Sequence, residues 1–298
     1  MLGVVIPVGP GDRELARLDA LVAELRRHER PSDVALVIVD DAPTARAIAP
    51  AWPQVAVLRT ALREHGRPDP FSAHVAGTLE ALAHVRDAGH EFALKLDTDA
   101  ALIRPFSETL RAAFEDVGVG VVGSYDRTAT GETRDWSMWR ARIDGADRPL
   151  AVRLGGRGIS VVHHPRRERE HVRTQRRAAA ARAPLGAHCL GGAYAVSRSF
   201  LRTAALEWRP WVGAGLGEDV VVGLLCSAAG LRMESLTGPG EPFALAWRGL
   251  PVPPSELAGA GHAIVHSVKA PTDAQERSLR RELQCAVTAV DASQVQST

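Results

Sequence analysis

The sequence predicts an α/β protein with a mostly parallel central sheet flanked by helices. Apolar runs of strand length occur at 2–8, 34–39, 54–60 and 92–96, and turn residues bound these runs. Segments with the apolar spacing of helices lie between them, and strands that alternate with helices are typical of a parallel sheet. The 298 residues, of which 45% are hydrophobic and 24% charged, provide enough chain to bury a substantial core.

The first predicted strand leads through Gly9-Pro10-Gly11 into a helix that Asp12 can cap. A dinucleotide-binding site opens in a similar way. The third glycine of that fingerprint is missing, however, and Pro7 and Pro10 stiffen the turn. We therefore rank a dinucleotide oxidoreductase below the other interpretations.

Two more carboxylates, Asp40 and Asp41, follow the second predicted strand and precede Ala42-Pro43. An aspartate at this point can accept a hydrogen bond from a base or a ribose, and it can equally form a turn or a helix cap. Helices are expected from about 71 to 86 and from Pro105, which suits a first helical turn.

The fourth predicted strand opens into two carboxylates one residue apart, Asp97 and Asp99. Ligands collect at the carboxyl ends of strands in open α/β sheets. Two acidic groups this close repel each other unless a cation lies between them, and a hard divalent ion that also binds substrate phosphates is a common solution. We interpret the pair as a binding site for a metal ion and a diphosphate. A motif this short also fits a solvated acidic turn.

The second half of the chain has a different pattern. A strand is expected at 118–125 and a β segment at 152–164, and the polar segment between them carries Trp136 and Trp139. The Arg-rich segment 166–182 is expected to form a solvated helix, with a patch for a phosphorylated or membrane-surface partner as the minority interpretation.

Gly191 and Gly192 precede a short predicted strand and permit close approach of the backbone. Further on, a glycine-rich loop that contains Trp211 ends in Glu218 and Asp219, at the first turn of a predicted helix. Acidic residues suit a helix N-terminus, so capping explains one of them. Two acids after such a loop indicate a site.

The last predicted strand, 259–269, carries His266. Its neutral imidazole can bind a metal, whereas a histidine on a strand is more often a structural hydrogen-bond partner. Thr272 and Gln275 have the spacing of a capping box for a final helix. No internal repeat or low-complexity linker divides the chain, so we do not cut it into independent domains.

Charge and composition exclude several classes of protein. The net charge of +1 gives no argument for a nucleic-acid partner. Cys189, Cys226 and Cys285 are too few and too scattered for a disulfide framework or a zinc site, which favours a reducing compartment such as the cytoplasm. The first residues already have the pattern of a strand, so we expect no charged leader, and no apolar run approaches the ~20 residues of a membrane span. The oligomeric state is not indicated by these patterns.

Taken in order, these segments resemble an A-type (GT-A) glycosyltransferase. The strand at 4–7 and the strand end at 37–41 are similar to those of the family 2 enzymes, and the segments 95–99 and 218–224 resemble the β1,3-galactosyltransferase and fringe group. The resemblance extends from residue 2 to about 269 and depends on the order and spacing of the motifs. Val8-Gly9 stands where the family usually has Tyr-Asn, and Ala42-Pro43 where it usually has Gly-Ser.

The resemblance implies one Rossmann-like GT-A domain over 1–298. Its nucleotide-sugar-binding half would be about 1–117, its acceptor-binding and catalytic half, with a smaller β region, about 118–270, and its C-terminal helix 271–298. The implied donor is a nucleoside-diphosphate sugar, most often a UDP-sugar, and the implied cofactor is Mn²⁺ or Mg²⁺.

The resemblance also implies roles for individual residues. The donor would be bound by Pro7, Asp40, Asp41, Asp97, Asp99, Gly191 and Gly192. The metal would be held by Asp97, Asp99 and His266. Asp219 would be the general base of an inverting transfer, and Glu218 would orient the acceptor or the base. The candidates for stacking on an acceptor ring, each of which can instead pack in the core, are Trp136, Trp139 and Trp211.

Two other functions stay open. A sugar-phosphate nucleotidyltransferase also uses carboxylates and a divalent ion on a nucleotide, but its attack is at phosphorus and it releases pyrophosphate. A non-catalytic module that binds sugar nucleotides or glycans would keep the fold without the chemistry. The sequence identifies neither the donor sugar nor the acceptor, which we expect to be a hydroxylated small molecule or a glycan.

Overall fold

The computed structural model describes residues 1–60, 62, 70–145, 150–155, 158–163 and 166–295. The helices and strands of this part are, in chain order, β1 (Leu2–Val8), α1 (Asp12–His28), η1 (Pro31–Asp33), β2 (Val34–Asp40), β3 (Val55–Leu58), α3 (Pro70–Asp87), β4 (Phe92–Leu96), β5 (Ala101–Leu102), α4 (Ser107–Ala113), β6 (Val119–Gly123), α5 (Ser137–Gly145), β7 (Leu150–Gly155), β8 (Gly158–His163), α6 (Arg166–Ala180), β9 (Ala193–Ser197), α7 (Arg198–Thr203), η2 (Arg209–Trp211), α8 (Glu218–Ala228), β10 (Arg232–Ser235), β11 (Phe243–Leu245), α9 (Pro254–Gly259), β12 (Ile264–His266) and α10 (Asp273–Val295).

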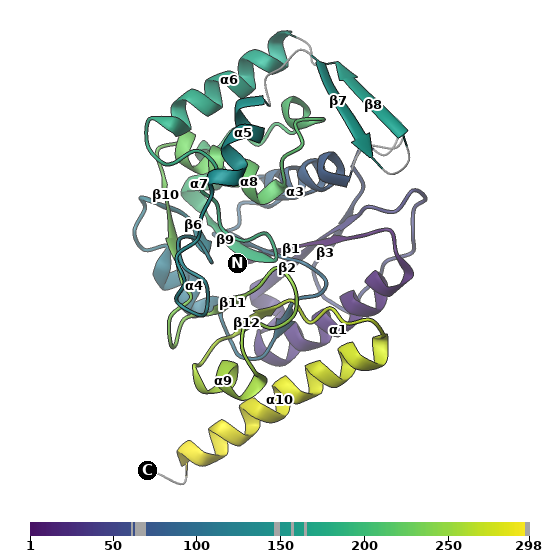
Figure 1. The fold of residues 1–298 in the computed structure, drawn as a ribbon. Helices are drawn as coiled ribbons and strands as arrows, with labels where there is room; N and C mark the ends of the chain where they lie inside the picture. The colour runs from purple at the N-terminus through teal and green to yellow at the C-terminus, as the bar shows by residue number, and fades with distance from the viewer. Residues whose placement is uncertain (61, 63–69, 146–149, 156–157, 164–165, 296–298) are drawn as a thin grey trace.

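A seven-stranded sheet runs through the centre of the molecule in the order β10, β6, β9, β4, β1, β2, β3 (Figure 1). Neighbouring strands are parallel except at β9, which is antiparallel to both β4 and β6. The fold is therefore mixed α/β with a mostly parallel central sheet flanked by helices, as the alternation of strand and helix patterns predicted.

The direction of β9 determines where the glycine pair lies. Because β9 runs against β4, its first residue, Ala193, pairs with Leu96 at the end of β4. Gly192 therefore arrives at the carboxyl end of β4, where its carbonyl accepts a hydrogen bond of 2.9 Å from the backbone N–H of Asp97. The carboxyl ends of the parallel strands β1, β2 and β4 lie at this same edge of the sheet.

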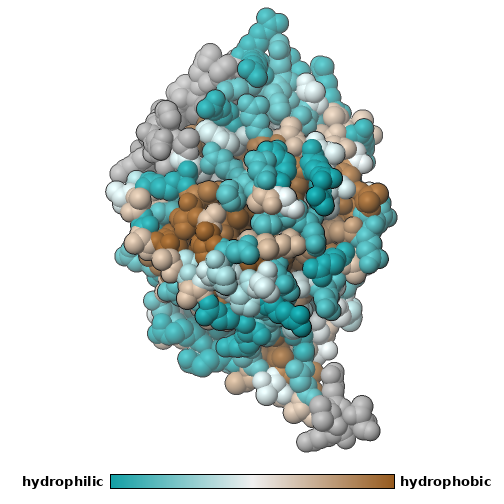
Figure 2. Space-filling model, turned by 180° about the vertical axis from the view of Figure 1, so that it is seen from behind, coloured by the Kyte–Doolittle hydropathy of each residue, from teal (hydrophilic) through white to brown (hydrophobic). Residues whose placement is uncertain are grey.

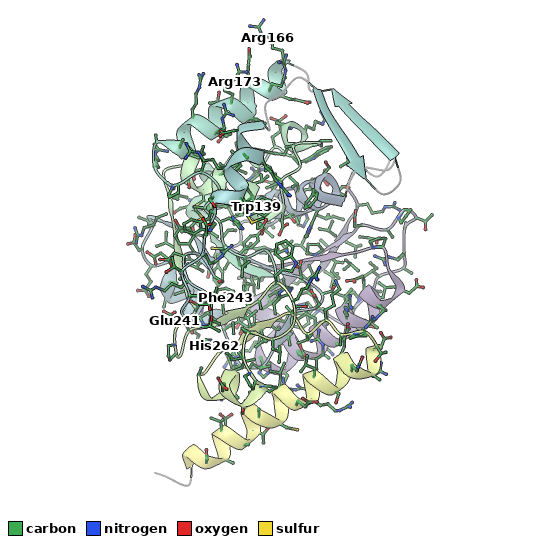
Figure 3. The ribbon with its side chains drawn as sticks, viewed as in Figure 1. Trp139, Arg166, Arg173, Glu241, Phe243 and His262 are labelled. Carbon is green, nitrogen blue, oxygen red and sulfur yellow. The ribbon has the colours of Figure 1, made fainter. Side chains whose placement is uncertain are left out.

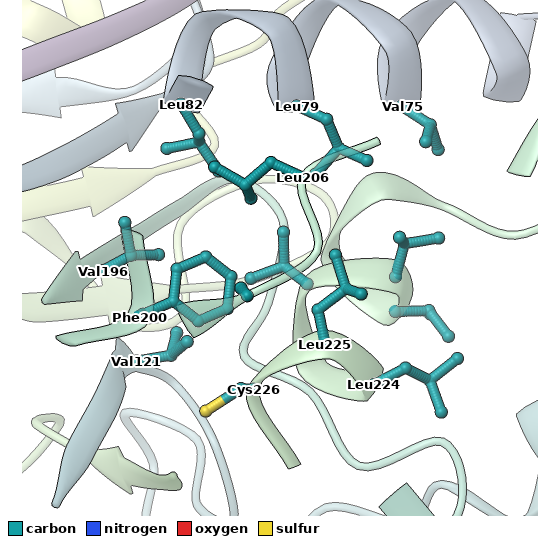
Figure 4. Packing of buried hydrophobic residues seen from close by; sticks show 14 of the residues in the cluster. Val75, Leu79, Leu82, Val121, Val196, Phe200, Leu206, Leu224, Leu225 and Cys226 are labelled. Carbon is teal, nitrogen blue, oxygen red and sulfur yellow. The ribbon is translucent and has the colours of Figure 1, made fainter. Parts of the chain in front are cut away.

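Helices cover both faces of the sheet. On one face α3 packs against β1 and β2, and α7 and α8 pack against β6. Figure 4 shows Leu79 of α3 in this layer, in the same cluster as Val196 of β9. On the other face α1 packs against β1 and α4 against β6. Alternate residues of β1 serve the two layers, since Val5 belongs to the first cluster and Val4 and Ile6 to the second.

The edge strand β3 is less well covered. Its Val55 and Val57 are 36% and 42% exposed. From behind, the described surface is largely hydrophilic around a hydrophobic patch (Figure 2). The extensive apolar clusters of the fold are otherwise enclosed between the sheet and its helices.

A small second sheet, in the order β11, β12, β5, brings the C-terminal part of the chain to the same edge. Strand β5 begins just after Asp99 and is antiparallel to β12, which ends at His266. The backbone N–H of Val268 donates to the carbonyl of Asp99 at 2.9 Å. Helix α10 runs beneath this sheet beside α1 (Figure 1), and Arg17 of α1 donates to Glu276 of α10 at 2.9 Å.

Most predicted elements are confirmed, with differences at their ends. The helix after the first strand begins at Asp12 itself, with Gly11 at its N-cap and no side-chain cap. The helix predicted from Pro105 begins at Ser107. Of the expected strand 259–269 only Ile264–His266 is a strand. The β segment at 152–164 is a hairpin of β7 and β8, and residue 164 lies outside the described residues.

Other predictions concern the ends of the chain and its cysteines. Thr272 and Gln275 form the predicted capping box, since the N–H of Thr272 donates to the side chain of Gln275 at 3.1 Å and the N–H of Gln275 to the hydroxyl of Thr272 at 3.3 Å. Cys189, Cys226 and Cys285 are free thiols. No helix within the described ranges is both long enough and apolar enough to cross a membrane.

The turn after β4 is braced by a buried arginine of α10. Arg280 donates to the carbonyls of Thr98 and Ala100 at 3.2 and 2.8 Å. It also pairs with Glu24 of α1 at 2.6 Å. Burial raises the pKa of Glu24 above its usual value, with Arg280 acting in the opposite direction. Arg280 therefore joins α1, α10 and the turn after β4, where Asp97 and Asp99 lie.

We expect the Arg280→Met variant to lose about 3–5 kcal/mol of unfolding free energy, because it leaves the Glu24 carboxyl buried without its partner. Urea denaturation measures the loss. The matched control is Arg277→Met on the exposed side of the same helix, for which we expect a change within about 0.5 kcal/mol. Equal stabilities of the two variants would contradict the bracing role of Arg280.

Candidate metal and carboxylate site

Asp97, Asp99 and His266 form a cluster at the carboxyl end of β4. One potential ligand atom from each lies within 4.8 Å of the others. His266 Nε2 is 3.2 Å from Asp99 Oδ1 and 3.8 Å from Asp97 Oδ2. The sequence predicted each of these residues separately, and the small sheet brings the histidine to the aspartates.

Neighbouring groups orient these side chains. The Nδ1–H of His266 donates to the carbonyl of Ala246 at 2.9 Å, which directs Nε2 toward the carboxylates. The hydroxyl of Ser267 donates to Asp99 Oδ2 at 2.7 Å. Although burial opposes ionisation, the hydrogen bond from His266 holds the pKa of Asp99 well below its usual range. Burial likewise opposes charging of His266, but the bond to Asp99 raises the pKa of the imidazole.

Two carboxylates and an imidazole with a fixed orientation fit a divalent cation. Mn²⁺ accepts both oxygen and imidazole ligands, and Mg²⁺ prefers oxygen. With three protein ligands, such an ion keeps coordination positions for water or phosphate oxygens. The donor set therefore suits an ion that also binds an anionic ligand.

A buried lysine joins this cluster to a second pair of acids. Lys95 is fully buried on β4, and its ammonium donates to Asp97 Oδ1 at 2.6 Å, to Glu218 Oε1 at 3.0 Å and to the carbonyl of Gly191. Burial opposes the charge, but the carboxylates of Asp97 and Glu218 raise the pKa of Lys95. His74 Nδ1 lies 3.3 Å from Glu218 Oε2. Burial opposes ionisation of Glu218, but His74 and Lys95 together lower its pKa.

Asp219, the next residue, lies beside a histidine rather than in a direct ion pair with a lysine. Its Oδ2 lies 3.6 Å from Nε2 of His188. That imidazole donates through Nδ1 to the carbonyl of Gly186 at 2.6 Å, and Nε2 accepts from Arg134 at 3.1 Å. Burial and the charge of Arg134 lower the pKa of His188 to about 4, so the ring is neutral. Burial and the adjacent Glu218 carboxylate raise the pKa of Asp219. Of the two acids, Asp219 is therefore the one that readily takes up a proton.

The glycine pair leaves space for these side chains. A Cβ at Gly192 would lie 2.4 Å from Nδ1 of His266, and a Cβ at Gly191 would lie 2.9 Å from Glu218 Oε1 and 3.0 Å from Asp219 Oδ2. The sequence predicts that both glycines bind the donor, and both line the larger of two cavities at this site. Their missing side chains also make room for the histidine and the acids.

Two adjoining cavities meet at the cluster. The larger has a volume of about 590 Å³, and its wall includes Asp99, His266, Glu218 and Asp219. The smaller, of about 260 Å³, extends to the carboxyl ends of β1 and β2. The residues that line both are His74, Asp97, Asp99 and Lys269. The potential metal ligands and the acid pair thus face one continuous region.

The other predicted donor residues divide between this region and the scaffold. Pro7 and Asp41 line the smaller cavity. Asp40 lines neither cavity and is 1% exposed. Its carboxylate accepts from the backbone N–H groups of Ala42 and Arg46 at 3.1 and 3.0 Å and pairs with the Arg46 guanidinium at 2.6 Å. The structure thus gives Asp40 the role of a turn residue, the alternative that the sequence left open.

The three predicted tryptophans also divide. Trp139, at the inner end of α5 in Figure 3, lines the larger cavity, and its ring meets that of His188 edge-on at 5.7 Å. Trp211 is 2% exposed within the hydrophobic core. Trp136 stacks on Tyr125 at 5.2 Å. Neither Trp136 nor Trp211 lines the two cavities, because both rings pack in or against the hydrophobic core.

Several residues of the site were not predicted. Lys95 had a detectable signal, since a lysine inside an apolar strand must find acidic partners when the strand is buried. His74 on α3 and His188 in the loop before β9 belong to no recognisable pattern. The arginine-rich segment forms the predicted helix, α6, on which Arg166 and Arg173 are labelled in Figure 3. Neither of these arginines lines the two cavities.

Comparison with known proteins does not identify a family: no family model matches the sequence, and no curated protein matches it.

We expect Gly192→Ala to weaken Mn²⁺ binding by about 10-fold to 100-fold, because the new methyl group displaces the His266 ring. Titration calorimetry of the metal-free protein with Mn²⁺ measures the affinity. Gly259→Ala is the control, since a Cβ there meets nothing within 4 Å. Equal Mn²⁺ affinity of the two variants would exclude His266 as a ligand.

Proposed function

We propose that the protein is a metal-dependent glycosyltransferase of the GT-A type. It would transfer a sugar from a nucleoside-diphosphate sugar, in the first place a UDP-sugar, to a hydroxyl group with inversion at the anomeric carbon. One observation carries this proposal: the Asp97-Asp99-His266 cluster and the acid Asp219 line the same cavity. The free thiols fit a cytoplasmic setting.

The smaller cavity suits the nucleoside. It lies at the carboxyl ends of parallel strands, where ligands collect in open α/β sheets, and Pro7 and Asp41 form part of its wall. Asp97 and Asp99 separate it from the larger cavity. With the nucleoside bound there, the diphosphate attached to it would lie against the metal ligands, and the sugar beyond the diphosphate would lie in the larger cavity.

A cation held by Asp97, Asp99 and His266 would neutralise the charge that develops on the departing diphosphate. The protein's own cation at the shared wall is Lys269, which is exposed there. It would add a charge-assisted contact to a phosphate oxygen. Lys95 is unsuited to that task, because its ammonium is buried against Asp97 and Glu218.

The environments of the two adjacent acids support different roles for them. The contacts of Glu218 with Lys95 and His74 lower its pKa and fix the position of its carboxylate. Asp219 faces a neutral imidazole and has a raised pKa, so it is the better proton acceptor. As the acceptor oxygen bonds to the anomeric carbon, the bond from that carbon to the phosphate oxygen breaks. The hydroxyl proton passes to Asp219, and the nucleoside diphosphate leaves.

We expect wild-type protein with Mn²⁺ to release free UDP from a UDP-sugar, and Asp219→Asn to lose this turnover by ~10²-fold or more, the usual scale for a lost proton acceptor. UDP affinity should stay unchanged. A screen of sugar nucleotides with a coupled UDP assay measures the turnover, and titration calorimetry measures the UDP affinity. Asp19→Asn, on the exposed face of α1, is the control.

The coproduct distinguishes the alternatives. Release of pyrophosphate from a nucleoside triphosphate and a sugar 1-phosphate, without UDP release from a UDP-sugar, would identify a nucleotidyltransferase. UDP-sugar binding without turnover would identify a binding module. Full turnover by the Asp219→Asn variant would exclude Asp219 as the base.

A further inference from the structure

The larger cavity has an apolar wall that the metal and acid chemistry does not use. Among the described residues, Met138 and Trp247 are two of the few large apolar side chains that are exposed, at 61% and 72%, and both line this cavity. Exposed apolar groups of this size, gathered in a concave site with polar neighbours, mark places where ligands bind.

Trp247 is held in place by the same segment that supplies the metal ligand His266. The backbone N–H of Ala246 donates to the carbonyl of His266 at 2.7 Å, and the N–H of Ser267 donates to the carbonyl of Gly249 at 3.0 Å. Trp247 and Arg248 therefore form the tip of a turn that is tied at both ends beside His266. Gly249, with a φ of +67°, allows the chain to turn back.

This apolar wall belongs to the larger cavity and not to the smaller cavity proposed for the nucleoside. Trp247, Met138 and Asp219 line the larger cavity and are absent from the wall of the smaller one. The cavities adjoin at Asp97 and Asp99. A molecule resting on Trp247 thus shares its cavity with Asp219, across the metal ligands from the nucleoside side.

The chemistry of the wall selects a kind of ligand. Its large apolar surfaces include Met138, Trp139 and Trp247, and its polar groups include Asp135 and Arg248. Arg248 is exposed there. A pyranose or cyclitol ring has this dual character, because its C–H face packs on an indole and its hydroxyls at the rim bond to carboxylate and guanidinium groups.

We infer that Trp247 is the platform of the acceptor site and that the acceptor is a saccharide or cyclitol ring, stacked on the indole with a hydroxyl toward Asp219. This inference rests on the proposed transferase function. It also replaces Trp136 and Trp211, two of the three tryptophans expected from the sequence, with one that the sequence did not single out.

The test uses the full-length protein saturated with UDP and Mn²⁺. Saturation-transfer NMR measures binding of methyl β-D-glucopyranoside, methyl β-D-galactopyranoside, myo-inositol and, as an aromatic probe, 4-methylumbelliferone. We expect at least one sugar or cyclitol to bind, with an affinity about tenfold lower in Trp247→Ala and less affected in Trp247→Phe. Val117→Ala, which truncates an exposed apolar residue outside the cavities, should bind like the wild type. UDP affinity should be equal in all variants.

The outcomes separate the two proposals. If UDP binds with Mn²⁺ but no sugar or cyclitol does, or if they bind equally to Trp247→Ala, the platform is overturned while the transferase stands. Binding of 4-methylumbelliferone alone overturns the ligand class. If UDP does not bind the wild type with Mn²⁺, the proposal of a UDP-sugar transferase fails and the platform fails with it.

Discussion

Repulsion among four carboxylates is the constraint on which this site depends. Asp97, Asp99, Glu218 and Asp219 line one cavity, and acids gathered in a poorly solvated place raise one another's free energy. The protein supplies a full positive charge through the buried Lys95, which bridges Asp97 and Glu218. The imidazole of His266 adds a second partner for Asp99. The remaining excess of negative charge is what a divalent cation would neutralise.

The scaffold around the acids opposes this repulsion with bonds from distant parts of the chain. The antiparallel strand β9 fixes Gly192 against Asp97, the small sheet fixes Ser267 against Asp99, and α10 fixes the intervening turn through Arg280. Each contact joins residues far apart in the sequence. The cluster is thus a product of the whole fold rather than of its local motif.

The sequence predicted what depends on local pattern. The parallel strands, their helices and the carboxylates that follow β4 can be read from apolar runs and turn residues, because strand and helix periodicities are local. The capping box of the last helix is equally local. The order of β6, β9 and β10 in the sheet and the existence of the short strands β5 and β11 depend on long-range pairing, so no local pattern indicated them.

Whether an individual side chain lines the site or packs in the scaffold was less predictable, because this too depends on long-range contacts. Asp40 and Asp41 are adjacent and chemically alike, yet Arg46 neutralises Asp40 while Asp41 lines a cavity. Trp211 is buried and Trp247 is exposed, although neither neighbourhood in the sequence reveals this. Burial of a large aromatic residue is decided by which elements pack over it, here α6 against η2.

Calorimetric titration of UDP into the wild type and into Asp99→Ala, each with and without Mn²⁺, tests the central claim most directly. If the acids hold a cation that grips the diphosphate, UDP binds the wild type strongly only with Mn²⁺, and this dependence disappears in the variant. Equal UDP affinity with and without Mn²⁺, or an unchanged Mn²⁺ dependence in Asp99→Ala, would contradict the account.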